Sequence, residues 1–195
     1  TNWADSLHII KGPMSTLYGA DAVAGVVDIN TRKKYKQNII AGLGYNNKHK
    51  FGYQTQIGPN KEFDFGFYQE QTDGLSTYPQ GTERDGNSID SINLGYTGKI
   101  NNTNYTILGI HTSQLTDLDA GSSDDTDYTA DTKFTFGQWR SYTDTDLGKI
   151  DLTIDKTIWN RDYVNGTEID VYDSNSNHIK LVNSNKHNKI KSKLG

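Results

Sequence analysis

The chain has 195 residues, of which 33% are hydrophobic, and its formal net charge is −4 at pH 7. A soluble globular domain usually has more apolar residues, while the 19 glycines and 12 tyrosines, set in short alternating runs, do not fit a disordered chain. The acidic balance argues against nucleic acid as a partner, and the absence of cysteine excludes disulfides and thiolate metal sites.

The first predicted element is the segment from Leu7 to Arg32, LHIIKGPMSTLYGADAVAGVVDINTR. Its pattern predicts a strand, a tight turn, a short helix, a second turn of small residues and a second strand. Pro13 ends the first strand because proline has no amide donor for the ladder, and Ser15 is placed to cap the helix. Gly25 permits a positive φ where the chain reverses. We assign these residues structural roles, because nothing in the segment has a catalytic pattern.

The rest of the chain alternates apolar and polar residues, which is the signature of β-strands. Seven strands are predicted, over 39–45, 51–58, 62–71, 91–100, 104–112, 133–139 and 149–158, with a weaker eighth from about Asn183 to the end. The apolar positions assigned to the later strands are Ile92, Leu94, Tyr96, Ile100, Leu108, Ile110, Phe134, Phe136, Ile150, Leu152, Ile154 and Ile158. An apolar strand face meets either a second sheet or lipid, and periodicity does not distinguish the two.

The connections between these strands alternate in length after a short first turn at 46–50. The long connections are 73–88, 116–131 and 165–178, and the short ones are 58–62, 101–104 and 143–148. Outer-membrane barrels have short periplasmic turns and long extracellular loops. We therefore expect the three long loops and the first turn on the extracellular side.

The Leu7–Arg32 segment closely resembles the C-terminal part of the plug domain of TonB-dependent outer-membrane receptors, which has fixed glycine, proline and aromatic positions. The matching residues are Lys11, Gly12, Pro13, Ser15, Leu17, Tyr18, Gly19, Ala22, Gly25, Val26, Val27, Ile29, Thr31 and Arg32. His8, Asp28 and Asn30 depart from the pattern.

The resemblance implies an all-β fold with a small α+β plug remnant. Residues 1–34 would be the C-terminal part of the plug. Residues 35–195 would be the N-terminal strands of a partial transmembrane antiparallel β-barrel, about eight strands of a 22-stranded plugged barrel. We expect a curved open sheet with bare edges and the plug piece against its concave face, and a closed eight-stranded barrel would contradict this. Because the chain begins at Thr1 without a signal sequence, we expect an internal fragment that lacks the N-terminal box that pairs with TonB.

The function implied by the resemblance is active transport across the outer membrane of a Gram-negative-type bacterium, and not catalysis. Such a receptor sits in outer-membrane lipid, binds a scarce nutrient at its extracellular loops and imports it with energy from the TonB system. Cobalamin is the favoured cargo, because the short first outer loop, the strand spacing and the acidic later loops resemble the cobalamin receptor branch. A ferric siderophore or haem is the alternative.

A second alternative comes from another class of protein. A secreted, soluble, calcium-dependent carbohydrate-binding β module would also have alternating strands. It would bury the apolar strand faces against each other and stay soluble without detergent.

The later long loops are rich in aspartate. Carboxylates on flexible loops are suitable calcium ligands, although no EF-hand spacing is present and solvated acidic loops are common. The resemblance to the cobalamin receptor branch implies that aspartates of these loops bind calcium and order the loops for substrate capture. The candidate ligands are Asp117, Asp119, Asp125, Asp127, Asp170 and Asp173.

Histidines and tyrosines supply the remaining candidates. The histidines show no metal-ligand spacing, and His49 and His178 are haem-ligand candidates against the alternative of ordinary surface residues. Four tyrosines are predicted near strand ends, where they would join aromatic girdles or line a ligand cavity; they are Tyr45, Tyr68, Tyr96 and Tyr105.

Overall fold

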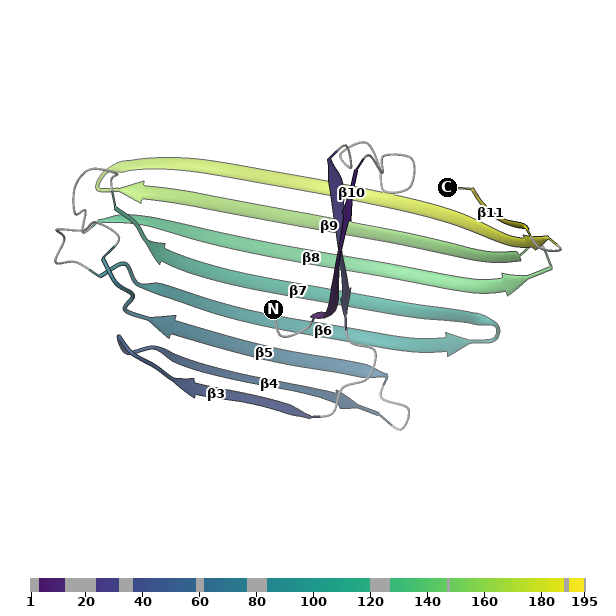
Figure 1. Cartoon of the computed structure of the whole chain (residues 1–195), viewed down its shortest axis with the longest axis horizontal. Coiled ribbons are helices and arrows are strands. Elements are labelled where there is room, and N and C mark those ends of the chain that lie inside the picture. The colour runs from purple at the N-terminus through teal and green to yellow at the C-terminus, as the bar shows by residue number, and fades with distance from the viewer. Residues whose placement is uncertain are drawn as a thin grey trace.

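The computed structural model covers the whole chain and describes residues 4–12, 24–31, 37–58, 62–76, 84–119, 127–146, 148–187 and 190–194. All the regular elements in these ranges are β-strands, arranged in two antiparallel sheets (Figure 1). The all-β prediction is confirmed. The short helix predicted after Pro13 lies outside the described residues. None of the described segments is a helix with the length and hydropathy of a membrane span.

The smaller sheet is a hairpin of β1 (Ala4–Lys11) and β2 (Gly25–Thr31), as the sequence predicts. Its register pairs Ile9 with Val27 and Lys11 with Gly25. Gly25 has a φ of +155°, and a Cβ at this position would lie 2.5 Å from the carbonyl oxygen of Ile10. Glycine is therefore required where the second strand begins.

The larger sheet is a nine-stranded antiparallel meander in which every strand pairs with its neighbours in sequence (Figure 1). Its strands are β3 (Asn38–Leu43), β4 (His49–Ile57), β5 (Phe63–Thr72), β6 (Asn87–Ile100), β7 (Thr103–Asp117), β8 (Tyr128–Thr145), β9 (Gly148–Asn165), β10 (Glu168–His187) and β11 (Ile190–Leu194). The sheet begins and ends with the unpaired edges of β3 and β11. The expected open sheet is confirmed, and the sheet does not close into a small barrel.

One predicted long loop is instead a strand. Residues Glu168–His178 pair along their whole length with β9, and only Gly166 and Thr167 separate the two strands. The sequence DSNSN, at 173–177, is rich in Asp and Asn, which strands usually avoid, and this is why it suggests a loop. The ladder with β9 overrides that local preference. The other two long connections remain, over 73–86 and 118–127, at the same end of the sheet.

The two faces of the large sheet differ in exposure and composition. We call them the apolar face, which carries Phe65 and Leu94, and the polar face, which carries Gln54 and Asn93. In β3–β10, all the exposed large hydrophobic residues except Tyr172 lie on the apolar face.

The buried residues of the same strands show the opposite distribution. Apart from Thr55, they lie on the polar face. Because side chains converge on the inner side of a curved sheet and diverge on the outer side, we take the polar face as concave and the apolar face as convex.

The register corrects the predicted side of four residues. Ile107, not Leu108, shares the apolar face with Leu94, because Ile107 pairs with Tyr96 and Trp139. The four residues Leu108, Ile110, Phe134 and Phe136 lie on the polar face. Together with Trp159, which pairs with Phe134, they form a small group of apolar residues on this otherwise polar face. Ile110 is only 4% exposed. The adjacent apolar residues Ile107 and Leu108 make the alternation ambiguous in the sequence.

Candidate functional site

The exposed apolar residues form a band that runs obliquely across the strands. On β5 the band is centred on Phe65, which pairs with Leu94 on β6. Followed through the register, this row reaches β10 at Asn177, which is polar. The exposed apolar residues of β10 near this row are Ile179 and Leu181, which lie further from the long-loop end. The band therefore moves along the strands as it crosses the sheet.

Aromatic pairs lie at the short-turn side of this band. The rings of Phe63 and Tyr96 are 5.0 Å apart, and those of Tyr105 and Trp139 are 6.2 Å apart. Two of the four predicted girdle tyrosines, Tyr96 and Tyr105, are thus at the expected edge. Tyr68 lies on the polar face instead, and Tyr45 is in the exposed turn between β3 and β4.

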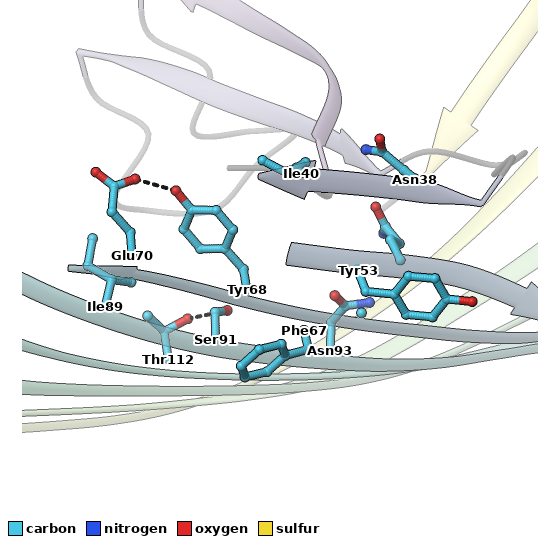
Figure 2. Close-up of a pocket in the computed structure, with 12 residues that line it drawn as sticks. Asn38, Ile40, Tyr53, Phe67, Tyr68, Glu70, Ile89, Ser91, Asn93 and Thr112 are labelled. Atoms are coloured by element: carbon cyan, nitrogen blue, oxygen red, sulfur yellow. Dashed lines mark hydrogen bonds between the residues drawn. The ribbon is translucent and has the colours of Figure 1, made fainter. Parts of the chain in front are cut away.

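The polar face has a hollow of about 310 Å³ over β3–β7, lined by amide and hydroxyl side chains together with apolar ones such as Ile40 and Ile89 (Figure 2). Gln54 lines this hollow and is 5% exposed, and neither atom of its amide group has a hydrogen-bond partner within the described part of the chain. Buried polar groups are almost always paired. Gln54 therefore marks a place on this face that is suited to a polar partner.

Several other polar groups around the hollow are paired. Asn93 donates to Asp64 at 2.8 Å, and the hydroxyls of Ser91 and Thr112 are 2.9 Å apart. The Tyr68 hydroxyl donates to Glu70 (Figure 2). These contacts fix the wall of the hollow.

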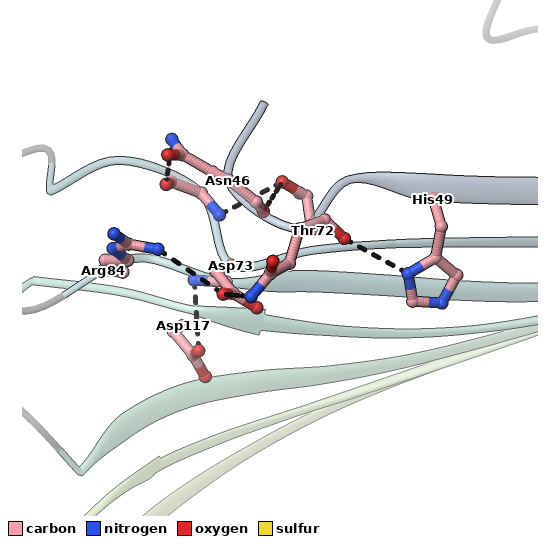
Figure 3. Close-up of polar contacts among 9 residues, drawn as sticks. Asn46, His49, Thr72, Asp73, Arg84 and Asp117 are labelled. Atoms are coloured by element: carbon pink, nitrogen blue, oxygen red, sulfur yellow. Dashed lines mark hydrogen bonds and ion pairs between the residues drawn. The ribbon is translucent and has the colours of Figure 1, made fainter. Parts of the chain in front are cut away.

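A hydrogen-bonded network joins the turns at the long-loop end (Figure 3). The Asn46 side chain donates to the Gly74 carbonyl at 2.6 Å, and the Asn46 carbonyl accepts from the Asp73 amide at 3.0 Å. Asp73 also forms an ion pair of 3.5 Å with Arg84. The β3–β4 turn thereby holds the start of the β5–β6 connection, and the ion pair between Asp73 and Arg84 joins its two ends.

Asp117, one of the predicted calcium ligands, takes part in this network. Its carboxylate accepts from the Gly86 amide at 3.1 Å, and its own amide donates to the Gly86 carbonyl at 2.9 Å (Figure 3). A Cβ on Gly86 would lie 2.7 Å from the Asp117 carboxylate. Asp117 thus fastens the start of β6 to the end of β7.

The other predicted calcium ligands are spread over several places. Asp170 and Asp173 are on β10 and point to opposite faces, because they are an odd number of residues apart in a regular ladder. Asp173 accepts from the Asn160 side chain at 2.6 Å. Asp119 follows β7, and Asp127 is exposed just before β8.

Within the described ranges, no three His, Asp or Glu residues group closely enough to hold a metal ion. Asp125 and most of the β7–β8 connection lie outside those ranges. Calcium binding by these loops therefore stays a prediction.

The two histidines considered as haem ligands are also placed. The His49 ring is 3.2 Å from the carbonyl oxygen of Asn47 in the β3–β4 turn (Figure 3). His178 lies in β10, with its ring 3.2 Å from the carboxylate of Asp155. Neither residue lies in a long loop.

Comparison with known proteins gives one short similarity. The chain matches no established protein-family profile. A stretch of 33 residues, 17% of the chain, is 54% identical to the iron-regulated outer membrane virulence proteins of two strains of Vibrio cholerae. The stretch covers 5% of the length of these relatives. The similarity indicates an outer-membrane receptor, on a small part of both chains.

Proposed function

We propose that this chain is part of an outer-membrane receptor that imports a scarce nutrient with energy from the TonB system. In this proposal β3–β11 are wall strands of a barrel and β1–β2 belong to its plug. The apolar face meets lipid, and the polar face meets the plug and the cargo. The role is transport and not catalysis.

The observation that carries the proposal is the separation of the two sheet faces. Strands of a transmembrane barrel alternate between lipid-facing apolar residues and polar residues that face the interior. Here the exposed hydrophobic residues lie on the face that is less crowded, and Leu94 remains 57% exposed near the middle of the band. A soluble sandwich would instead need a second layer over this face.

The oblique path of the apolar band also supports a membrane wall. If the strands are tilted by about 40°, a band that is level in the membrane moves about 4 Å, or a little over one residue, along each successive strand. Summed over the five steps from β5 to β10 this is about 20 Å, and the displacement from Asn177, in the row of Phe65, to Ile179 and Leu181 is smaller, at two to four residues. It leaves the start of β10 on the extracellular side of the band, in agreement with its polar sequence at 173–177.

The nature of the cargo is a finer part of the proposal. The name of the Vibrio cholerae relatives, iron-regulated, favours an iron compound such as a ferric siderophore or haem. Cobalamin remains the prediction from the resemblance of the loops.

Deletion of the gene for the full-length protein tests the proposal. Uptake of labelled ferric siderophores, haem and cobalamin is measured in the deletion strain, in a strain without TonB and in the parent. We expect one cargo to be lost in both mutants and the protein to fractionate with the outer membrane. A soluble protein, or unchanged uptake of every cargo, would contradict the proposal.

A further inference from the structure

A cluster of aromatic residues surrounds Arg161 on the polar face of β9, toward the long-loop end. The guanidinium carbon lies 4.9 Å from the ring centre of Trp159 and 5.7 Å from that of Tyr163. These three residues alternate along β9 and therefore share one face. The distances are those of cation–π contacts.

Hydrogen bonds hold the guanidinium in place. The Arg161 Nε donates to the hydroxyl of Thr132 on β8 at 2.8 Å, and Nη1 donates to the Tyr163 hydroxyl at 3.1 Å. A guanidinium has five N–H donors, so several remain available. The Arg161 side chain is thus held in place, while some of its N–H donors remain available for a ligand.

Arg161 differs from the other described arginines in its charge partner. Arg140, on the same face at the other end of β8, forms a two-point ion pair with Asp151, and Arg84 pairs with Asp73. Within the described ranges Arg161 forms no ion pair. Asp170 lies on the same face of β10, opposite Tyr163 in the register, and forms no ion pair with Arg161.

Tyrosines extend the cluster across three strands. Tyr163 packs edge-on against Tyr172 of β10 at 5.8 Å, and Tyr128 of β8 lies 6.2 Å from Tyr163. Tyr172 is 54% exposed, the one exposed large hydrophobic residue on this face of β3–β10. The rings of Tyr128, Tyr163 and Tyr172 therefore form an accessible aromatic surface, the aromatic ledge, beside the positive charge of Arg161.

We propose that Arg161, Trp159, Tyr163 and Tyr172 bind a ligand that carries an anionic group on a flat aromatic ring. The anion takes the free donors of Arg161, and the ring stacks on the aromatic ledge. A planar guanidinium suits this task because it bonds anions at two points and stacks on rings. The assignment rests on the proposed function, in which this face meets the cargo.

Binding of three small probes to the detergent-solubilised full-length protein tests the site. Benzoate has both the charge and the ring, cyclohexanecarboxylate has the charge alone, and benzyl alcohol has the ring alone. Ligand-observed NMR should give binding of benzoate that is about tenfold tighter than that of either other probe, because the charge and the ring each contribute.

Variants localise the effect. We expect Arg161→Gln to weaken benzoate binding about tenfold, because it removes a charged hydrogen-bond donor. Arg161→Lys should restore part of it, because the charge remains and the planar fork is lost. Arg140→Gln is the matched control and should leave it unchanged. Equal binding of benzoate and cyclohexanecarboxylate, or unchanged binding by a folded Arg161→Gln variant, would overturn the assignment.

The outcome is separable from the proposed function. If the protein resides in the outer membrane and imports a nutrient, but Arg161→Gln binds benzoate as the parent does, only the ligand site is wrong. If the protein is not in the outer membrane, the proposed function fails whatever the benzoate result.

Discussion

The two faces of the large sheet share the same strands and differ only in which alternate residues they present. On β6, Leu94 is exposed on the apolar face, while its neighbour Asn93 is 9% exposed on the polar face and bonds to Asp64. A water-soluble protein would reverse this relation between polarity and burial. The exposed face therefore needs an apolar environment, and the inner face needs polar partners.

The largest expected effect comes from placing a charge on the apolar face. Leu94→Arg should destabilise the full-length protein in the membrane by ~2–4 kcal/mol, the cost of arginine at the bilayer midplane. Thr97→Arg, on the polar face of the same strand, is the matched control. The amount of folded protein in the outer membrane, measured by heat-modifiable gel migration, should fall for Leu94→Arg alone. Equal losses for both variants would remove the distinction between the faces.

A smaller effect is expected at the long-loop end. Asp117→Ala removes the acceptor of the Gly86 amide and should cost about 1–2 kcal/mol locally. Limited proteolysis followed by mass spectrometry should show faster cleavage in the β5–β6 connection. Asp90→Ala, an exposed carboxylate on β6, is the control and should leave the rate unchanged. An unchanged cleavage rate for Asp117→Ala would show that the hydrogen bonds between Asp117 and Gly86 do not hold the β5–β6 connection in place.

Gln54 tests whether the polar face has a partner beyond the described residues. Since its amide is buried without a partner there, Gln54→Leu should be neutral or stabilise the protein by less than ~1 kcal/mol in denaturant unfolding. A loss of more than ~1 kcal/mol would mean that another group bonds to Gln54.

Calcium gives the smallest expected change. Because Asp170 and Asp173 point to opposite faces of β10, one ion cannot bind both. Titration calorimetry of Asp170→Asn and Asp173→Asn should show that at most one of them weakens calcium binding. A large and equal loss in both variants would require β10 to rearrange at its start.

Much of the architecture is predictable because alternation is a direct consequence of strand geometry. The runs around Phe65 and Leu94 follow from it, while the N-terminal hairpin follows from its proline and glycine positions. The start of β10 does not, because its polar residues obtain their strand structure from pairing with β9. The face on which Leu108 lies can also be assigned only from the strand register, because its neighbour Ile107 is equally apolar.

The candidate sites were harder to predict than the strands. The spacing of Trp159, Arg161 and Tyr163 is itself a period-two signal, but their importance depends on Thr132 and Tyr172 from neighbouring strands. Conversely, the candidate aspartates are separated: Asp117 bonds to Gly86, Asp127 lies just before β8, and Asp170 and Asp173 lie on opposite faces of β10. Sequence proximity does not bring carboxylates together in an extended chain.

Spin-label scanning along β6 tests directly whether the apolar face meets lipid, and this chain contributes no native cysteine that would also be labelled. Single labels are placed from Ser91 to Tyr96 in the membrane-inserted full-length protein. Collision with oxygen, which concentrates in lipid, is compared with collision with a water-soluble nickel chelate. We predict high oxygen access at Ile92, Leu94 and Tyr96 and low access at the alternate positions. A flat profile, or strong nickel access at Leu94, would contradict a lipid-facing wall.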